Sequence, residues 1–167
     1  MNKTTPAKIR QWKDYKDLCV KHEALNSALV SKDIAKVGRC ISDYEIAVGR
    51  LARTFSEKVW LRKDHCSVDH GEDGVYCEFE IEQGHSHALQ IVAEASGLDR
   101  KRTADLMRSN SITFKRGFCV NAAAGPDEVI ELLIETQDKF SESVEFIRDC
   151  LAAGLAQALT KIESEKN

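Results

Sequence analysis

Residues that break and turn a chain are scarce in this sequence. Its 167 residues include only two prolines and nine glycines, and aromatic residues make up 7%. β-Sandwiches and barrels need many tight turns, so this scarcity argues against both classes. Alanine, leucine, glutamate, lysine and arginine are plentiful instead, and they favour helices. A chain of 167 residues with 43% hydrophobic residues suits one domain with a real core.

Long apolar runs and a large net charge are also missing. No stretch approaches the roughly eighteen uninterrupted apolar residues of a membrane-spanning helix, and no apolar run follows the charges near Lys3 and Lys8. We therefore expect a cytoplasmic protein with no membrane partner. The net charge of −3 argues against a protein that coats nucleic acid over its whole surface, although a local basic patch stays open. The six cysteines are scattered along the chain, and we expect free thiols.

The most regular pattern predicts two facing helices in the first third of the chain. Apolar residues at steps of three and four share one stripe of a helix. The second of the two stripes comprises Ile34, Val37, Ile41, Tyr44, Val48, Leu51 and Phe55. The first comprises Tyr15, Leu18, His22, Leu25 and Leu29, with His22 interpreted as a core residue. Pro6 is available to open the first helix and Ser31 to cap the second. A turn around Val30 to Lys32 then joins them as an antiparallel hairpin.

The last third predicts a further helical segment. Gly125, Pro126, Asp127 and Glu128 are typical of a helix start, because proline suits the first turn and acids suit the positive end of the helix dipole. The segment is one very long helix or two helices with a break near residues 136–141. Small residues near its end allow close helix packing, either in the core or in a dimer interface. The candidate interface residues are Leu151, Gly154, Leu155, Ala158 and Leu159.

The middle third predicts a small β element. Val75, Cys77, Phe79 and Ile81 alternate with polar residues, which is the pattern of a half-buried strand. A second extended candidate covers residues 111–121. The first half of residues 64–82 is interpreted as a loop, and residues 86–96 and 99–109 as short helices broken at Gly97.

Taken together, these patterns predict a mainly α fold in a single domain over residues 1–167. An N-terminal helical hairpin (6–62) and a long C-terminal helical segment (126–164) would form a helical bundle. Residues 63–121 would supply loops, short helices and a small β insert. The α+β class is the fallback.

Six candidate metal ligands fall within 23 residues of the middle third. They are His65, Cys66, His70, Cys77, His85 and His87. Zinc accepts imidazole and thiolate donors in a four-coordinate shell. However, the set contains no Cys-x2-Cys pair, and surface histidines with two core cysteines explain the same residues. A catalytic thiol and imidazole pair is the weaker interpretation, because spacing does not bring the groups within reach. No cofactor is predicted, and zinc is the metal to test.

A weak helix-turn-helix pattern runs from Leu89 to Leu106. Ala93 and Gly97 occupy the positions where two helices cross and turn, but Ser96 and Thr103 stand where a stronger match has bulky apolar residues. Six basic residues in and after this segment are candidates for phosphate contacts. They are Arg100, Lys101, Arg102, Arg108, Lys115 and Arg116. An ordinary helix pair with a solvated basic face is the alternative, and so is pairing of these cations with the acidic C-terminal segment.

No phosphate-binding loop, nucleophile elbow or His-Glu-x-x-His pattern is present. The features that stand out are packing surfaces and complementary charge. We therefore predict a non-catalytic, homo-oligomeric binding or interaction protein, most simply a dimer. A helix-turn-helix DNA-binding regulator and a metal-binding protein are the two alternatives.

Overall fold

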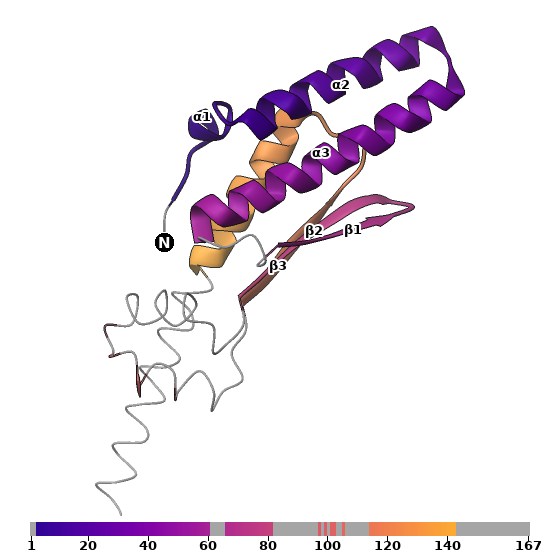
Figure 1. The fold of residues 1–167 in the computed structure, drawn as a ribbon. Helices are drawn as coiled ribbons and strands as arrows, with labels where there is room; N and C mark the ends of the chain where they lie inside the picture. Colours follow the sequence, from indigo (N-terminus) through magenta and orange to yellow (C-terminus); the bar gives the residue numbers. More distant parts are fainter. Residues whose placement is uncertain are drawn as a thin grey trace, which may run out of the picture. The chain divides into compact units, whose positions relative to one another are not determined.

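The computed structural model describes residues 3–60, 66–81, 97, 99, 101–102, 105 and 114–142. The chain divides into two compact units. The first comprises Met1–Glu80 with Lys115–Gln137, and the second comprises Ile81–Phe114 with Asp138–Asn167. The chain is mostly helical with a small three-stranded sheet, so the α+β fallback describes it (Figure 1).

The first unit contains the elements labelled in Figure 1. They are α1 (Pro6–Ile9), α2 (Lys13–Ser31), α3 (Ile34–Trp60), β1 (Cys66–Gly71), β2 (Gly74–Ile81) and β3 (Phe114–Val120). A further helix, drawn in orange, is described over residues 126–142, of which residues 126–137 belong to this unit. It starts at the predicted Pro126 and continues through residues 136–141, so the alternative break does not occur there.

Two details of the predicted hairpin are wrong at its ends. Pro6 opens the separate short helix α1, whose N-cap is Thr5, and α2 begins only after Trp12. Ser31 is the last residue of α2, where its hydroxyl donates to the Ala28 carbonyl 2.7 Å away. Asp33 caps α3 instead, because its carboxylate accepts the Lys36 backbone N–H at 3.2 Å. A carboxylate two residues later competes better for the cap because it meets the positive end of the helix dipole.

The helical hairpin itself is confirmed. α2 and α3 run antiparallel, with Leu18 and Leu25 of α2 and Tyr44 and Leu51 of α3 buried between the elements (Figure 1). The stripe prediction is wrong where the two helices meet, because Leu29 and Ile34 at the turn are exposed and no element in the described part of the chain covers them. Packing therefore covers the base and middle of the hairpin and leaves its end exposed.

The three strands form an antiparallel sheet in the order β1-β2-β3. β2 and β3 confirm the two predicted extended segments, although residues 111–113 lie outside the described residues. The loop predicted for the first half of residues 64–82 is wrong over β1. This strand pairs with β2, Val68 opposite Cys77, through the two-residue turn Glu72–Asp73. β1 contains only two apolar residues, so its own alternation of apolar and polar residues is weak. Pairing with β2 is therefore what stabilises it as a strand.

The sheet lies along α3 on the side away from α2 (Figure 1). Gly49 of α3 allows the close approach, because a Cβ there would lie 2.9 Å from a methyl group of Val68. A series of aromatic rings continues the core across the layers. Phe55 of α3 contacts Phe79 of β2 with ring centroids 5.9 Å apart, and Phe79 contacts Phe118 of β3 at 6.2 Å.

The 126–142 helix is tied to the N-terminal segments by polar contacts within the first unit. Gln137 donates to the Thr4 carbonyl at 3.1 Å and accepts the Thr4 N–H at 2.8 Å. The Tyr44 hydroxyl donates to the carbonyl of Ala124, just before the helix. Val129 and Leu133 are buried on its inner face. None of the helices among the described residues combines the length and the apolar character needed to cross a membrane.

Candidate functional site

The two most exposed large apolar side chains in the described part of the chain lie at the end of the helical hairpin. Val30 is 83% exposed and Ile34 is 88% exposed, and Leu29 beside them is 54% exposed. The turn between them is well ordered by hydrogen bonds, since Lys32 N–H donates to the Leu29 carbonyl at 3.3 Å and Asp33 caps α3. We call residues 29–36 the hairpin tip. The hydrogen-bonded backbone of the hairpin tip keeps these apolar side chains exposed to solvent.

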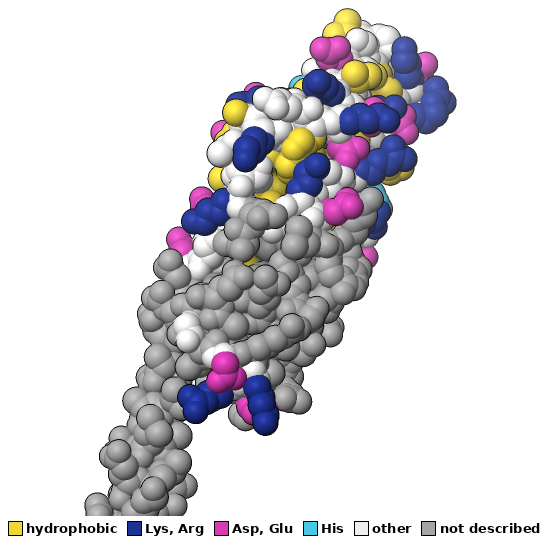
Figure 2. Space-filling view, turned by 60° about the vertical axis from the view of Figure 1, so that its left-hand side comes forward, with side chains coloured by type: hydrophobic (Ala, Val, Ile, Leu, Met, Phe, Trp, Pro, Cys, Tyr) yellow, Lys and Arg dark blue, Asp and Glu magenta, His cyan; other side chains and the backbone are white. Residues whose placement is uncertain are grey.

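The hairpin tip is also basic. Lys32 and Lys36 are exposed, Arg39 follows on the next turn of α3, and none of the three forms an ion pair with another described residue. The carboxylate of Asp33 is engaged at the start of α3. Toward the upper end of Figure 2, dark blue basic side chains lie beside yellow apolar ones, with magenta acidic side chains among them. An apolar surface with surrounding cations is suited to an acidic, partly apolar partner.

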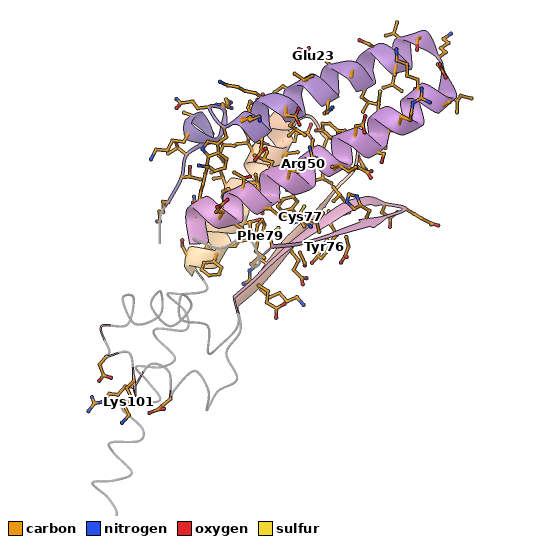
Figure 3. All side chains as sticks on the ribbon, in the orientation of Figure 1. Glu23, Arg50, Tyr76, Cys77, Phe79 and Lys101 are labelled. Carbon is orange, nitrogen blue, oxygen red and sulfur yellow. The ribbon has the colours of Figure 1, made fainter. Side chains whose placement is uncertain are left out.

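An open pocket of about 410 Å³ lies at the other end of α2, against the start of the 126–142 helix. Its lining residues are Tyr15, Cys19, His22, Glu23, Gly125, Pro126, Asp127 and Glu128. Three of these residues are acidic and none is lysine or arginine. His22, predicted as a core residue, is half-buried here with its ring beside Tyr44 at a centroid distance of 5.7 Å. Figure 3 labels Glu23, which marks the α2 side of this acidic pocket.

Part of the polar lining of the acidic pocket is used internally. The Tyr15 hydroxyl donates to Asp127 at 3.1 Å, and Arg10 donates to the same carboxylate oxygen at 3.4 Å. Loss of hydration, with hydrogen bonds to Cys19 and Asp127, raises the pKa of Tyr15 to about 12. Tyr15 is therefore protonated near neutral pH and does not act as a base. Glu23 and Glu128 are exposed and stay available to a partner.

Three of the six candidate metal ligands lie on the sheet. Cys66 and Cys77 are buried, and Figure 3 shows Cys77 on the side of β2 that faces α3. Burial raises the pKa of each thiol to about 12, so both stay protonated near neutral pH and are poor nucleophiles.

The third ligand, His70, is exposed at the far end of β1, with Nδ1 4.0 Å from a Glu45 carboxylate oxygen. His70 lies four positions after Cys66 along the strand, roughly 13 Å away, so the two do not bind one ion together. Within the described residues, no three His, Cys, Asp or Glu side chains are grouped to hold a metal. His65, His85 and His87 lie outside the described residues, so the metal site stays a prediction.

The predicted basic residues fall in both compact units. In the first unit, Lys115 of β3 pairs with Glu78 of β2 at 3.1 Å, which raises the pKa of Lys115, and Arg116 is exposed beside it. In the second unit, Lys101 and Arg102 are exposed in a helix. Arg100 and Arg108 lie outside the described residues.

The turn expected in the second unit is present. Gly97 has a left-handed φ of 68°, and the Asp99 carboxylate accepts the Arg102 N–H at 3.0 Å as a helix N-cap does. Asp99 also pairs with the Arg102 side chain at 3.6 Å, which offsets one of the cations. The helices predicted on either side are otherwise outside the described residues.

Sequence reasoning missed both the exposed hairpin tip and the acidic pocket. The predicted interface at Leu151 to Leu159 lies outside the described residues and stays a prediction. A usable signal for the tip was the pair Val30 and Ile34, because these apolar residues directly flank the polar turn Ser31-Lys32-Asp33. The pocket had no such signal, because Tyr15 and Asp127 are 112 residues apart.

Comparison with known proteins adds no relative. No protein-family model, no curated protein and no solved structure matches this chain.

Proposed function

We propose that the protein is a non-catalytic binding protein that functions as a homo-oligomer, most simply a dimer, through its hairpin tip. The single observation that carries the proposal is the exposure of Val30 and Ile34 at one turn, 83% and 88%. Burying an aliphatic side chain of this size releases about 1.5–3 kcal/mol. Association that covers both residues in a symmetric dimer would bury four such side chains, two from each copy.

The chemistry of the described residues supports binding over catalysis. The buried thiols Cys66 and Cys77 are protonated and face the core. The hydroxyl of Tyr15 is engaged by Asp127. The exposed polar groups include the carboxylates of Glu23 and Glu128 and the ammonium groups of Lys32 and Lys36, which suit recognition of an oppositely charged surface.

The test is the mass of the protein in solution, by size-exclusion chromatography with light scattering over a range of concentrations. We expect a dimer whose dissociation constant rises at least about tenfold in Val30→Ser with Ile34→Ser, since about 1.4 kcal/mol of lost burial corresponds to tenfold. Val20→Ser is the matched control, because Val20 is an exposed valine of α2, 60% exposed, outside the tip. A strict monomer at high concentration contradicts the proposal.

The small-residue segment Leu151 to Leu159 is a second candidate surface for the dimer contact. If the C-terminal helical segment instead completes the predicted bundle with the hairpin, these residues form core. Gly154→Leu distinguishes the two surfaces, because a bulky side chain blocks close helix packing there. Loss of the dimer in this variant, with no effect of the tip variant, would assign the contact to the C-terminal segment.

The left-handed Gly97 and the Asp99 cap favour a DNA-binding regulator as the second candidate function. They are the turn and helix start that a helix-turn-helix requires. Binding to random duplex DNA that falls steeply with salt, and is lost in Lys101→Ala with Arg102→Ala, would support this candidate. Absence of binding at low salt would remove it.

A further inference from the structure

The hairpin tip and the acidic pocket belong to the same compact unit and are complementary. The tip is convex and apolar, with the exposed cations Lys32 and Lys36. The pocket is a hollow of about 410 Å³, within the usual range of ligand pockets. Its three acids, Glu23, Asp127 and Glu128, are exposed, and Asp127 is paired with Arg10. A projecting apolar side chain with cations beside it fits such a hollow in both shape and charge.

One line of residues on α2 joins the two features. Cys19 and Glu23 line the pocket, Asn26 is exposed, and Val30 is at the tip. Steps of four, three and four place these residues on one stripe of the helix. Val30 lies eleven positions after Cys19 along the helix, roughly 16 Å away, so the tip of a chain does not reach its own pocket. The tip of a second copy does.

We propose that two copies pair with their α2 helices antiparallel along this stripe, so that the tip of each copy enters the acidic pocket of the other. The twofold axis passes between Glu23 and Asn26, and Val30 of one copy then lies over Cys19 of its partner copy. Each contact occurs twice, as a closed dimer requires. The inference depends on the proposed function, whose dimer it specifies.

Charge disfavours the simpler pairing of tip with tip. Two tips would bring Lys32 and Lys36 of both copies together, against a single acid in each tip, Asp33, whose carboxylate accepts the Lys36 N–H. Like charges held close in an interface oppose association. The antiparallel arrangement instead places these cations near carboxylates.

A charge-exchange experiment tests the pairing on the full chain. One variant carries Lys32→Glu with Lys36→Glu, and the other carries Glu23→Lys with Glu128→Lys. We expect each variant alone to dimerise at least about tenfold more weakly than the wild type, because tip and pocket then carry the same charge. Mixed together they should form a dimer of near wild-type affinity, since both contacts of the mixed pair are complementary. Far-UV circular dichroism checks that each variant is folded.

Cross-linking tests the register independently. In Val30→Cys, a mild oxidant such as copper phenanthroline should link Cys19 of one copy to position 30 of the other. The product is a covalent dimer on non-reducing gels, with the linked peptides identified by mass spectrometry. A bond within one chain is excluded, because disulfide Cα atoms lie closer than about 7 Å. Ser27→Cys is the control, since this exposed residue lies off the stripe and should form no link to Cys19.

The outcomes separate the inference from the function beneath it. The antiparallel dimer is supported if the mixture of the two charge variants regains dimer affinity and if Cys19 of one copy forms a disulfide with position 30 of the other. A wild-type dimer without restoration or without that link overturns the inference and leaves the proposed function standing. A wild-type monomer overturns both.

Discussion

At the scale of single residues, backbone conformation distinguishes two glycines that look equivalent in the sequence. Gly71 and Gly74 flank the Glu72–Asp73 turn and face each other across β1 and β2. Gly74 has a φ of 125°, and a Cβ there would lie 2.2 Å from the Val120 carbonyl oxygen of β3. At Gly71 the nearest atom to an added Cβ is 4.0 Å away. Only Gly74 is required by the backbone.

We expect Gly74→Ala to lower the free energy of unfolding by about 2–3 kcal/mol, through the unfavourable φ and the collision with the β3 backbone. Urea unfolding followed by circular dichroism measures this loss. Gly71→Ala is the control and should change stability by less than about 1 kcal/mol. Equal losses in the two variants would mean that β3 does not approach Gly74 this closely.

At the scale of elements, α3 shows how packing reverses a local preference. Gly38 and Gly49 both lie within this helix, where alanine is about 1 kcal/mol more favourable than glycine. Nothing lies within 4 Å of a Cβ added at Gly38, whereas one at Gly49 meets Val68 of β1 at 2.9 Å. The contact between helix and sheet therefore decides the effect of the same substitution.

Gly38→Ala should raise the free energy of unfolding by about 0.5–1 kcal/mol, and Gly49→Ala should fail to do so. Thermal or urea unfolding of the two variants measures the difference. Adding Val68→Ala to Gly49→Ala should recover part of the helix gain, because it removes the methyl groups that collide. If Gly49→Ala alone stabilises as much as Gly38→Ala, α3 does not lie against β1 as described.

At the scale of the whole molecule, buried thiols couple stability to pH. Burial raises the pKa of Cys66 and Cys77 from 9.0 to about 12. Above pH 9 the unfolded chain loses these protons while the folded chain keeps them, so stability is complete below pH 9 and is lost as pH rises toward 12. Tyr44, whose pKa burial also raises, acts in the same direction.

We expect Cys77→Ala to lower stability at pH 7 and to reduce its alkaline decline, by on the order of 1.4 kcal/mol per pH unit above pH 9. Urea unfolding at pH 7, 9, 10 and 11 measures both effects. Val75→Ala is the matched control, because Val75 is equally buried on β2 and carries no titrating group. An unchanged decline in Cys77→Ala would show that this thiol does not titrate with unfolding.

Much of the secondary structure could be predicted because its signals are local. The stripe containing Tyr44 and Leu51 predicts α3, the alternation from Val75 to Ile81 predicts β2, and Pro126 marks a helix start. Each signal is a repeat or a terminal residue within one element, so no distant contact is needed to interpret it. The β1 strand lacked such a signal, because its partner β2 supplies most of the stabilising contacts.

The sequence by itself determined the helical hairpin, the β2 strand and the location of charge along the chain, since all three depend on neighbours within a few residues. Only the tertiary structure decided that Val30 and Ile34 are exposed, that Gly49 contacts Val68, and that the acidic pocket exists. The reason is physical. Exposure depends on how far the covering elements extend, and a pocket forms where segments more than one hundred residues apart meet.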